Sequence, residues 1–335
     1  MTKRRFQTLF TIFCLALLFF FPAASVEGAK NGLLLWFNIV LPTLLPFLIF
    51  SNLCVQLHIT QAFSVFLYPV LKHLMPISPD GCYPIAIGLL SGYPMGAKAC
   101  ADMVNNGKIS VKEGQFLLSF CNNASPMFLL NYLFLQSLHI NRHLPAFMGI
   151  MLGSSLLCGY LYLFLHSITP TKETFPSQTD FSNHGRTYKQ KHKKEAPPAT
   201  TDSEASSHPT YFQILDQSIM NGFEIITKIG GYIILFSLLA NLICSYTPCS
   251  ELINALLIGI LEITTGIQYI ADSALTFPTK LLLATALSAF GGLSSVAQTG
   301  SVLLHSPLKL TTYVVYKLLN SLICFLALFA YLQFI

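Results

Sequence analysis

Gly88-Leu-Leu-Ser-Gly-Tyr-Pro-Met-Gly-Ala-Lys98 interrupts a long apolar run with glycines and a proline, and the remainder of the chain can be understood from this stretch. A second interruption, Cys121-Asn-Asn-Ala-Ser-Pro126, follows after a polar turn at residues 105–108. Lipid offers no partner to a freed backbone amide or carbonyl, so a broken segment at membrane depth is tolerated only where it is buried in protein or lines a polar cavity. In transporters such a cavity holds the cargo. The two interruptions therefore predict a membrane protein with an internal polar site.

The composition is that of a protein that crosses a membrane many times. Of the 335 residues, 53% are apolar and only 10% are charged, and several apolar stretches approach the roughly 20 residues that a helix needs to cross hydrocarbon. The 9 cysteines stand singly without a CxxC pair, so we assign no metal site, no disulfide framework and no cofactor. Most basic residues lie in loops beside the spans, where they set topology, so nucleic acid is not an expected partner.

We expect an all-α chain with an N-terminal anchor, two repeats and a polar loop between the repeats. The anchor is residues 1–31, the repeats are 32–166 and 211–335, and the loop is 167–210, which we expect to be disordered and cytoplasmic. The basic start and the small residues at 22–25 are also typical of a secretory signal peptide. We favour an uncleaved first span.

Two apolar segments are interpreted as re-entrant hairpins, and two others as spans broken in the middle. The hairpins are 82–104 and 252–274, and the broken spans are 115–136 and 280–304. Residues 59–75 are expected to form a helix along the membrane surface, and an amphipathic lead-in from Tyr211 precedes a later span. The expected crossings are 6–21, 32–57, 115–136, 144–166, 229–246, 280–304 and 310–334.

The second half of the chain repeats the order of elements in the first half. An offset of 170 residues aligns Gly96 with Gly266, Asp102 with Asp272 and Ser125 with Ser295, and an offset of 190 aligns Asn31-Gly32 with Asn221-Gly222. The shared order of breaks carries the argument, because chance matches are common in apolar chains. If neither hairpin crosses, each repeat has three crossings, and an odd number inverts the second repeat relative to the first.

Basic residues test this orientation through the positive-inside rule. With the N-terminus in the cytoplasm, only Lys30, Arg142 and Lys280 fall outside, and the other basic residues, Lys317 among them, fall on the cytoplasmic side. Counting either hairpin as a crossing would scatter the charges over both faces. The charge distribution therefore favours seven crossings.

At the stretch 88–98 and at Ser119-Phe-Cys-Asn-Asn-Ala-Ser-Pro-Met-Phe128, the sequence resembles sporulation integral membrane proteins of the YlbJ (SpoVV) type, of the Gate or nucleoside-recognition domain group. This resemblance implies an inverted-repeat Gate fold like the core of concentrative nucleoside transporters, in which two hairpins and two broken helices surround the substrate. It also implies a cargo, dipicolinic acid, exported from the mother cell across the outer forespore membrane during sporulation. The implied partners are this solute and membrane lipids, and a homo-oligomer is compatible with the sequence.

The first hairpin and the first broken span carry the candidate cargo contacts. A dianionic pyridine dicarboxylate needs donors and positive potential, and the N-termini of half-helices supply both. The candidates are the backbone near Ser91, Gly92 and Gly96, the ring of Tyr93, and the side chains of Asn122, Asn123 and Ser125. Their counterparts in the second repeat are Thr264, Thr265, Gly266, Gly291, Gly292, Ser294, Ser295 and Gln298. As an alternative, the glycines form only a packed turn, and the asparagines only satisfy the backbone that Pro126 frees.

Two charged residues stand close to the breaks. Lys98 could attract the carboxylates of the cargo, or it could extend to the membrane surface with its charge in water. Glu262 lies within an apolar run, where an ionisable group is by default a functional candidate. It could carry a coupling proton, or it could cap a helix or form a salt bridge near the hairpin tip.

We do not expect an enzyme, because neither a Gly-x-Ser-x-Gly motif nor a phosphate-binding loop is present. A structural or signalling membrane protein of sporulation is the main alternative to a transporter. Within the transporter class, a nucleoside or another small anion is the alternative cargo.

Overall fold

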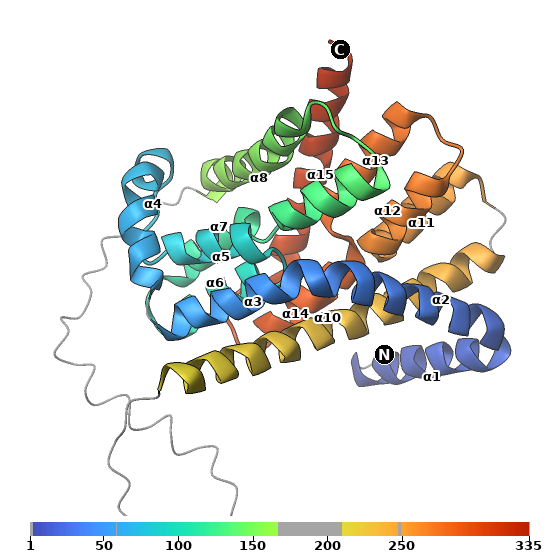
Figure 1. Cartoon of the computed structure of the whole chain (residues 1–335), viewed down its shortest axis with the longest axis horizontal. Coiled ribbons are helices and arrows are strands. Elements are labelled where there is room, and N and C mark those ends of the chain that lie inside the picture. The colour runs from blue at the N-terminus through green and yellow to red at the C-terminus, as the bar shows by residue number, and fades with distance from the viewer. Residues whose placement is uncertain (1–2, 58, 167–209, 247–248, 335) are drawn as a thin grey trace, which may run out of the picture.

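The computed structural model describes all residues except 1–2, 58, 167–209, 247–248 and 335. The described part is helical throughout and has no strand (Figure 1). The polar loop expected at 167–210 lies outside the described residues, apart from its last residue. The fold class expected from the sequence, an all-α chain with many apolar helices, is confirmed at this level.

Residues 22–56 form one long helical rod with a wide turn inside it, and the first helix folds back beside its start (Figure 1). Helix α1 (Lys3–Phe20) turns into α2 (Pro22–Leu35), which continues through the π-helical turn η1 (Trp36–Val40) into α3 (Leu41–Gln56). The amide of Leu41 bonds the carbonyl of Trp36, five residues back. This wider turn directly precedes Pro42, whose ring would clash with the preceding turn of a regular helix. The sequence placed the start of this span at residue 32, but the helix begins at Pro22, which suits a first helical position.

Helix α10 (Tyr211–Tyr246) packs against this rod in the antiparallel direction, as Figure 1 shows. Gly28 lies against Leu238, Gly32 against Ile234, and Gly222 against Ile49, so residue numbers fall on one helix as they rise on the other. A Cβ added at Gly28 or Gly32 would come within 2.9 Å of a Cα atom of α10. Glycine therefore permits the close approach of the two backbones.

Two helix hairpins lie on opposite sides of the molecule (Figure 1). The first consists of α5 (Cys82–Ser91) and α6 (Met95–Asn105), and the second of α11 (Glu251–Leu261) and α12 (Ile263–Asp272). Each half is too short to cross a membrane alone. In both hairpins the halves touch through glycine, since Gly96 packs on Gly88 and Gly266 packs on Gly259.

Two further helices are broken in the middle, as the sequence predicts. The first consists of α7 (Val111–Cys121) and the π-helix η2 (Phe128–Ser137), with residues 122–125 non-helical between them. The second consists of α13 (Phe277–Phe290) and α14 (Gly292–Leu303), separated where Gly291 and Gly292 have φ of 89° and 78°. The remaining helices are α4 (Thr60–Leu74), α8 (Leu144–His166) and α15 (Leu310–Leu332).

Five helices of the described part are long and apolar enough to cross a membrane. They are Pro22–Cys54, Leu144–His166, Tyr211–Tyr246, Phe277–Leu303 and Leu310–Leu332. The other two expected crossings correspond to α1, which carries three basic residues, and to the broken pair α7 and η2, which is no single helix. Helix α10 also differs from the prediction, because the lead-in and the span form one continuous helix of 36 residues.

Candidate solute-binding site

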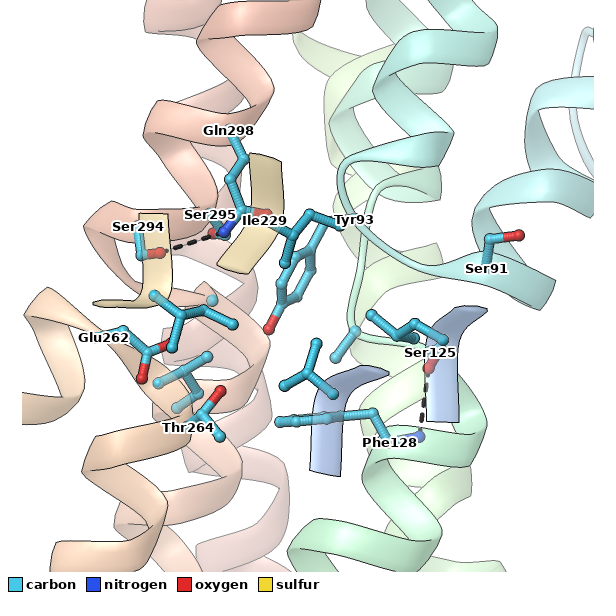
Figure 2. A pocket seen from close by; sticks show the side chains of 16 residues that line it. Ser91, Tyr93, Ser125, Phe128, Ile229, Glu262, Thr264, Ser294, Ser295 and Gln298 are labelled. Carbon is cyan, nitrogen blue, oxygen red and sulfur yellow. Dashed lines mark hydrogen bonds between the residues drawn. The ribbon is translucent and has the colours of Figure 1, made fainter. Parts of the chain in front are cut away.

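The hairpin turns and the helix breaks meet around a small central cavity, shown in Figure 2. Each of the four elements contributes polar side chains: Ser91 and Tyr93, Ser125, Glu262 and Thr264, and Ser294, Ser295 and Gln298. Apolar side chains of the rod and of α10 complete the wall: Val40, Leu44, Ile229 and Ile233. Eight of the residues predicted from the two motifs and their offset counterparts therefore lie around one space.

The central cavity has a volume of about 30 Å³. A water molecule needs roughly 10–15 Å³ on this measure, so the space holds about two waters and no organic solute. Tyr93 occupies the middle of the view in Figure 2, with its hydroxyl between the Glu262 side and the Phe128 side. The structure is therefore closed around its centre.

Two polar atoms of the cavity wall have no hydrogen-bond partner in the structure. These are the hydroxyl of Ser91, a residue with 1% of its surface exposed, and Oε1 of Gln298, a residue with 4% exposed. The amide nitrogen of Gln298 donates to Ser294 Oγ at 3.2 Å (Figure 2). Unsatisfied buried polar atoms are costly and call for an explanation. The Gln298 oxygen therefore marks where water or a polar ligand can bind, whereas the Ser91 hydroxyl points away from the other labelled side chains (Figure 2).

Glu262 caps the N-terminus of α12. Its Oε2 accepts hydrogen bonds from the amide of Thr265 at 2.6 Å and from the Thr265 hydroxyl at 2.9 Å. The side chain is buried, and no Lys, Arg or His of the described residues lies within ion-pair distance of it. The capping role weighed for Glu262 is thus present, and Glu262 also lines the central cavity.

Asn122 lies outside the central cavity and joins three elements. Its Oδ1 accepts from the amide of Ala97 in the first turn of α6, and its Nδ2 donates to Thr299 Oγ1 and Tyr313 Oη, all at 3.0–3.1 Å. The free amides at the start of a helix need such a partner. Asn123 donates to the carbonyl of Phe120 at 2.6 Å. Both side chains therefore form structural contacts at the break, although neither bonds the carbonyl of Asn122 that Pro126 leaves free.

Six other predicted residues also lie outside the central cavity, Gly266 and Gly292 among them. Gly92, with φ of 76°, and Gly96 allow close contact with the first break, because an added Cβ would approach Ser125 N within 2.7 Å or Cys121 O within 2.8 Å. Lys98 forms an ion pair with Asp102 at 2.7 Å, and 41% of its side chain is exposed. Thr265 faces a separate cavity.

Lys317 is a buried residue near the site that the sequence did not predict. The positive-inside rule placed it on the cytoplasmic side, and that prediction needs correction. Only 1% of this residue is exposed, and no carboxylate of the described residues pairs with it. Its ammonium donates to Asn123 Oδ1 at 3.0 Å and to the carbonyl of Asn122 at 3.4 Å. A lone lysine in an apolar run was the available signal.

Two larger cavities flank the centre. The first, which we call the lysine vestibule, has a volume of about 610 Å³ and contains Lys98 and Lys228; it shares Ile229 and Gln298 with the central cavity. The second, the side cavity, has about 460 Å³ and lies between α2, the second half of α10 and α12. Along α10, Ile229 and Ile233 line the central cavity. The vestibule borders α10 up to Tyr232, and the side cavity borders it from Ser237 onward.

Together, the long apolar helices and the buried polar centre define an integral membrane protein with several crossings. The chain is 26% identical over 339 residues to the sporulation integral membrane protein YlbJ of Bacillus subtilis (strain 168), covering 93% of this chain and 78% of that protein. This similarity confirms the resemblance to YlbJ-type sporulation proteins that the two motifs predict. No family model matches the chain, and no solved structure matches it.

Proposed function

We propose that this protein is a membrane transporter of a small organic anion. The observation that carries the proposal is the closed central cavity, where two hairpin turns and two helix breaks meet around Glu262 and the unpartnered Oε1 of Gln298. Irregular backbone at membrane depth is typical of cargo sites in secondary transporters. We propose the lysine vestibule and the side cavity as the two approaches to this site.

We further propose that the two halves are inverted repeats of a Gate-like fold. Lys98 bonds Asp102, and the residues 170 positions later repeat the pair, because Gln268 Nε2 bonds Asp272 Oδ2, both at 2.7 Å. The contacts between the rod and α10 fit the second offset in the same way. Gly32 packs on Ser237, and Gly222, 190 positions later, packs on Leu45 and Ile49, which bracket residue 47, the counterpart of Ser237. Such reciprocal contacts are expected of two equivalent halves.

We propose dipicolinic acid as the cargo and the outer forespore membrane as the location. Support for this choice comes from the similarity to a sporulation integral membrane protein and from the chemistry of the centre. The hydroxyls of Ser125 and Ser294, which accept hydrogen bonds and keep a proton to donate, line the cavity, and the ammonium of Lys317 binds the adjacent break. Hydroxyl donors and a buried cation suit a carboxylate ligand. The resemblance, rather than the geometry, selects the pyridine dicarboxylate.

Deletion in a spore-forming host tests this function. A strain without the protein should still make dipicolinic acid in the mother cell but should fail to load it into spores. The acid is assayed in both compartments, and the wild-type copy is returned as the control. Normal loading in the deletion strain would remove the proposed cargo. The purified protein is also tested for dipicolinate uptake in lipid vesicles. If the deletion strain fails to load its spores but the vesicles take up no dipicolinate, the structural or signalling alternative is favoured.

A further inference from the structure

Hydrogen bonds link the Glu262 carboxyl to the side cavity. In the proposed transport function, on which this inference rests, a dicarboxylate would lie beside the Glu262 carboxyl in the central cavity. Two like charges at such a place repel strongly, because the dielectric constant is low there. Co-binding a proton to Glu262 removes the repulsion. The proton then needs a route to a carboxyl that is 2% exposed.

A chain of hydrogen bonds supplies this route. The Thr265 hydroxyl donates to Glu262 Oε2 at 2.9 Å, and Thr265 Oγ1 lies 2.6 Å from Ser237 Oγ. Thr265 has a single hydroxyl proton, so Ser237 is the donor in the second bond. All three groups are therefore aligned in one direction, toward the carboxylate.

The series of hydrogen bonds leads from the central cavity to the side cavity. Glu262, at one end, lines the central cavity, whereas Thr265 and Ser237 line the side cavity. The wall of the side cavity contains five amide or carboxylate side chains, those of Asn31, Asn38, Asn241, Gln268 and Asp272. Amides and carboxylates at such a place need water, because lipid cannot satisfy them. Water in the side cavity can therefore deliver a proton to Ser237.

We propose that Ser237 and Thr265 form a proton path from the side cavity to Glu262, and that this protein couples its cargo to protons. Ser237 Oγ takes a proton from a hydronium ion, its own proton passes to Thr265 Oγ1, and the Thr265 proton passes to Glu262 Oε2. The carboxylate becomes a neutral carboxylic acid, one water is left behind, and no net charge remains on the hydroxyls. Rotation of the two hydroxyls restores the starting alignment.

Other titratable groups near the path must be separated from Glu262. Those of the described residues that line either cavity are Tyr93, Cys244, Tyr269 and Asp272, and Tyr132 donates to the carbonyl of Thr264 at 2.7 Å. Asp272 is the one carboxylate among these groups of the described residues, and it is exposed. Asp272→Asn should keep the pH dependence of transport, whereas Glu262→Gln should abolish it.

The first test uses lipid vesicles that contain the purified protein and a pH-sensitive dye, with dipicolinate as the probe. Thr265→Val and Ser237→Ala should each slow dipicolinate-driven proton movement at least tenfold, and Thr265→Ser should restore it. Thr285→Val and Ser288→Ala are the matched controls, because these buried hydroxyls bond only the carbonyls of Leu281, Leu282 and Ala284 in their own helix. Wild-type proton movement in Thr265→Val would overturn the path.

The second test needs no cargo and so separates the path from the transport function. Infrared difference spectra after a pH jump follow the carboxylic acid band of Glu262, which Glu262→Gln identifies. The band should appear at least tenfold more slowly in Thr265→Val than in the wild type or in Thr285→Val. If dipicolinate is not taken up but this difference persists, the path stands and the cargo is wrong. Equal rates would refute the path even if uptake is normal.

Discussion

At the scale of single residues, Lys317 places a positive charge beside the first helix break that the sequence did not predict. Its ammonium contacts the chain at Asn122 and Asn123, directly before Ala124 and Ser125, which line the central cavity. A buried positive charge keeps its influence over several ångströms, because the surroundings screen it weakly. The lysine therefore gives the break a positive potential, and a cation without a carboxylate partner in the described chain is available to an anionic cargo.

Lys317→Met keeps most of the side-chain length and removes the charge. We expect uptake of dipicolinate to fall about tenfold, which corresponds to roughly 1.4 kcal/mol, whereas competition by the uncharged diamide of the same acid should not change. Lys309→Met is the control, because Lys309 is exposed at the start of the same helix. Competition assays in vesicles, normalised to folded protein, give the measurement. Equal losses for the anion and the diamide would assign Lys317 a purely structural role.

At the scale of elements, the contact between the first hairpin and the first break positions the cavity wall. Gly92 has φ of 76°, and a Cβ there would lie 2.7 Å from Ser125 N. Gly107 has a similar φ of 67°, but an added Cβ would meet nothing within 4 Å. The two glycines therefore have similar backbone conformations, but Gly92 is tightly packed and Gly107 is not.

Gly107→Ala should cost only about 1–2 kcal/mol for the left-handed backbone. Gly92→Ala should cost more, and it should also abolish uptake, because the hairpin and the break must move apart. Thermal unfolding in detergent compares the stabilities, and vesicle uptake compares the activities. If the two variants unfold at the same temperature and Gly92→Ala remains active, this contact does not hold the cavity together.

The elements also show what sequence alone can predict. Glycine and proline at 88–98, 121–126 and 291–292 mark the turns and breaks, because few other residues allow such backbone at membrane depth. The extent of α10 was missed, since its first half carries Gln, Asn, Glu and Lys side chains that an apolar pattern excludes. Several of these line the lysine vestibule. Ser125 lines the central cavity, and Asn122 does not. This difference depends on the direction of each side chain at the break, which the spacing in the sequence does not specify.

At the scale of the whole molecule, the two halves offer equivalent groups with different charge. The vestibule holds the pair Lys98 and Asp102, and the side cavity holds the pair Gln268 and Asp272. One approach therefore carries a cation where the other has a neutral amide. An anion approaching the side with Lys98 meets the more favourable potential. This difference distinguishes the two approaches of the proposed inverted repeat.

An inverted arrangement places the ends of the two hairpins on opposite faces of the membrane. Asn106, after α6, and Ala274, after α12, are both exposed, so cysteines introduced there should react with a membrane-impermeant thiol reagent. We expect Ala274→Cys to react in intact cells and Asn106→Cys only after the cells are opened, because the basic residues place the first hairpin's end in the cytoplasm. The unmodified chain is the background control, since the described cysteines are buried or partly buried. Phe334→Cys, at an exposed position near the end of α15, should react like Ala274→Cys. Reaction of Asn106→Cys and Ala274→Cys from the same face would eliminate the inverted repeat, and with it the assignment of the vestibule and the side cavity to opposite sides.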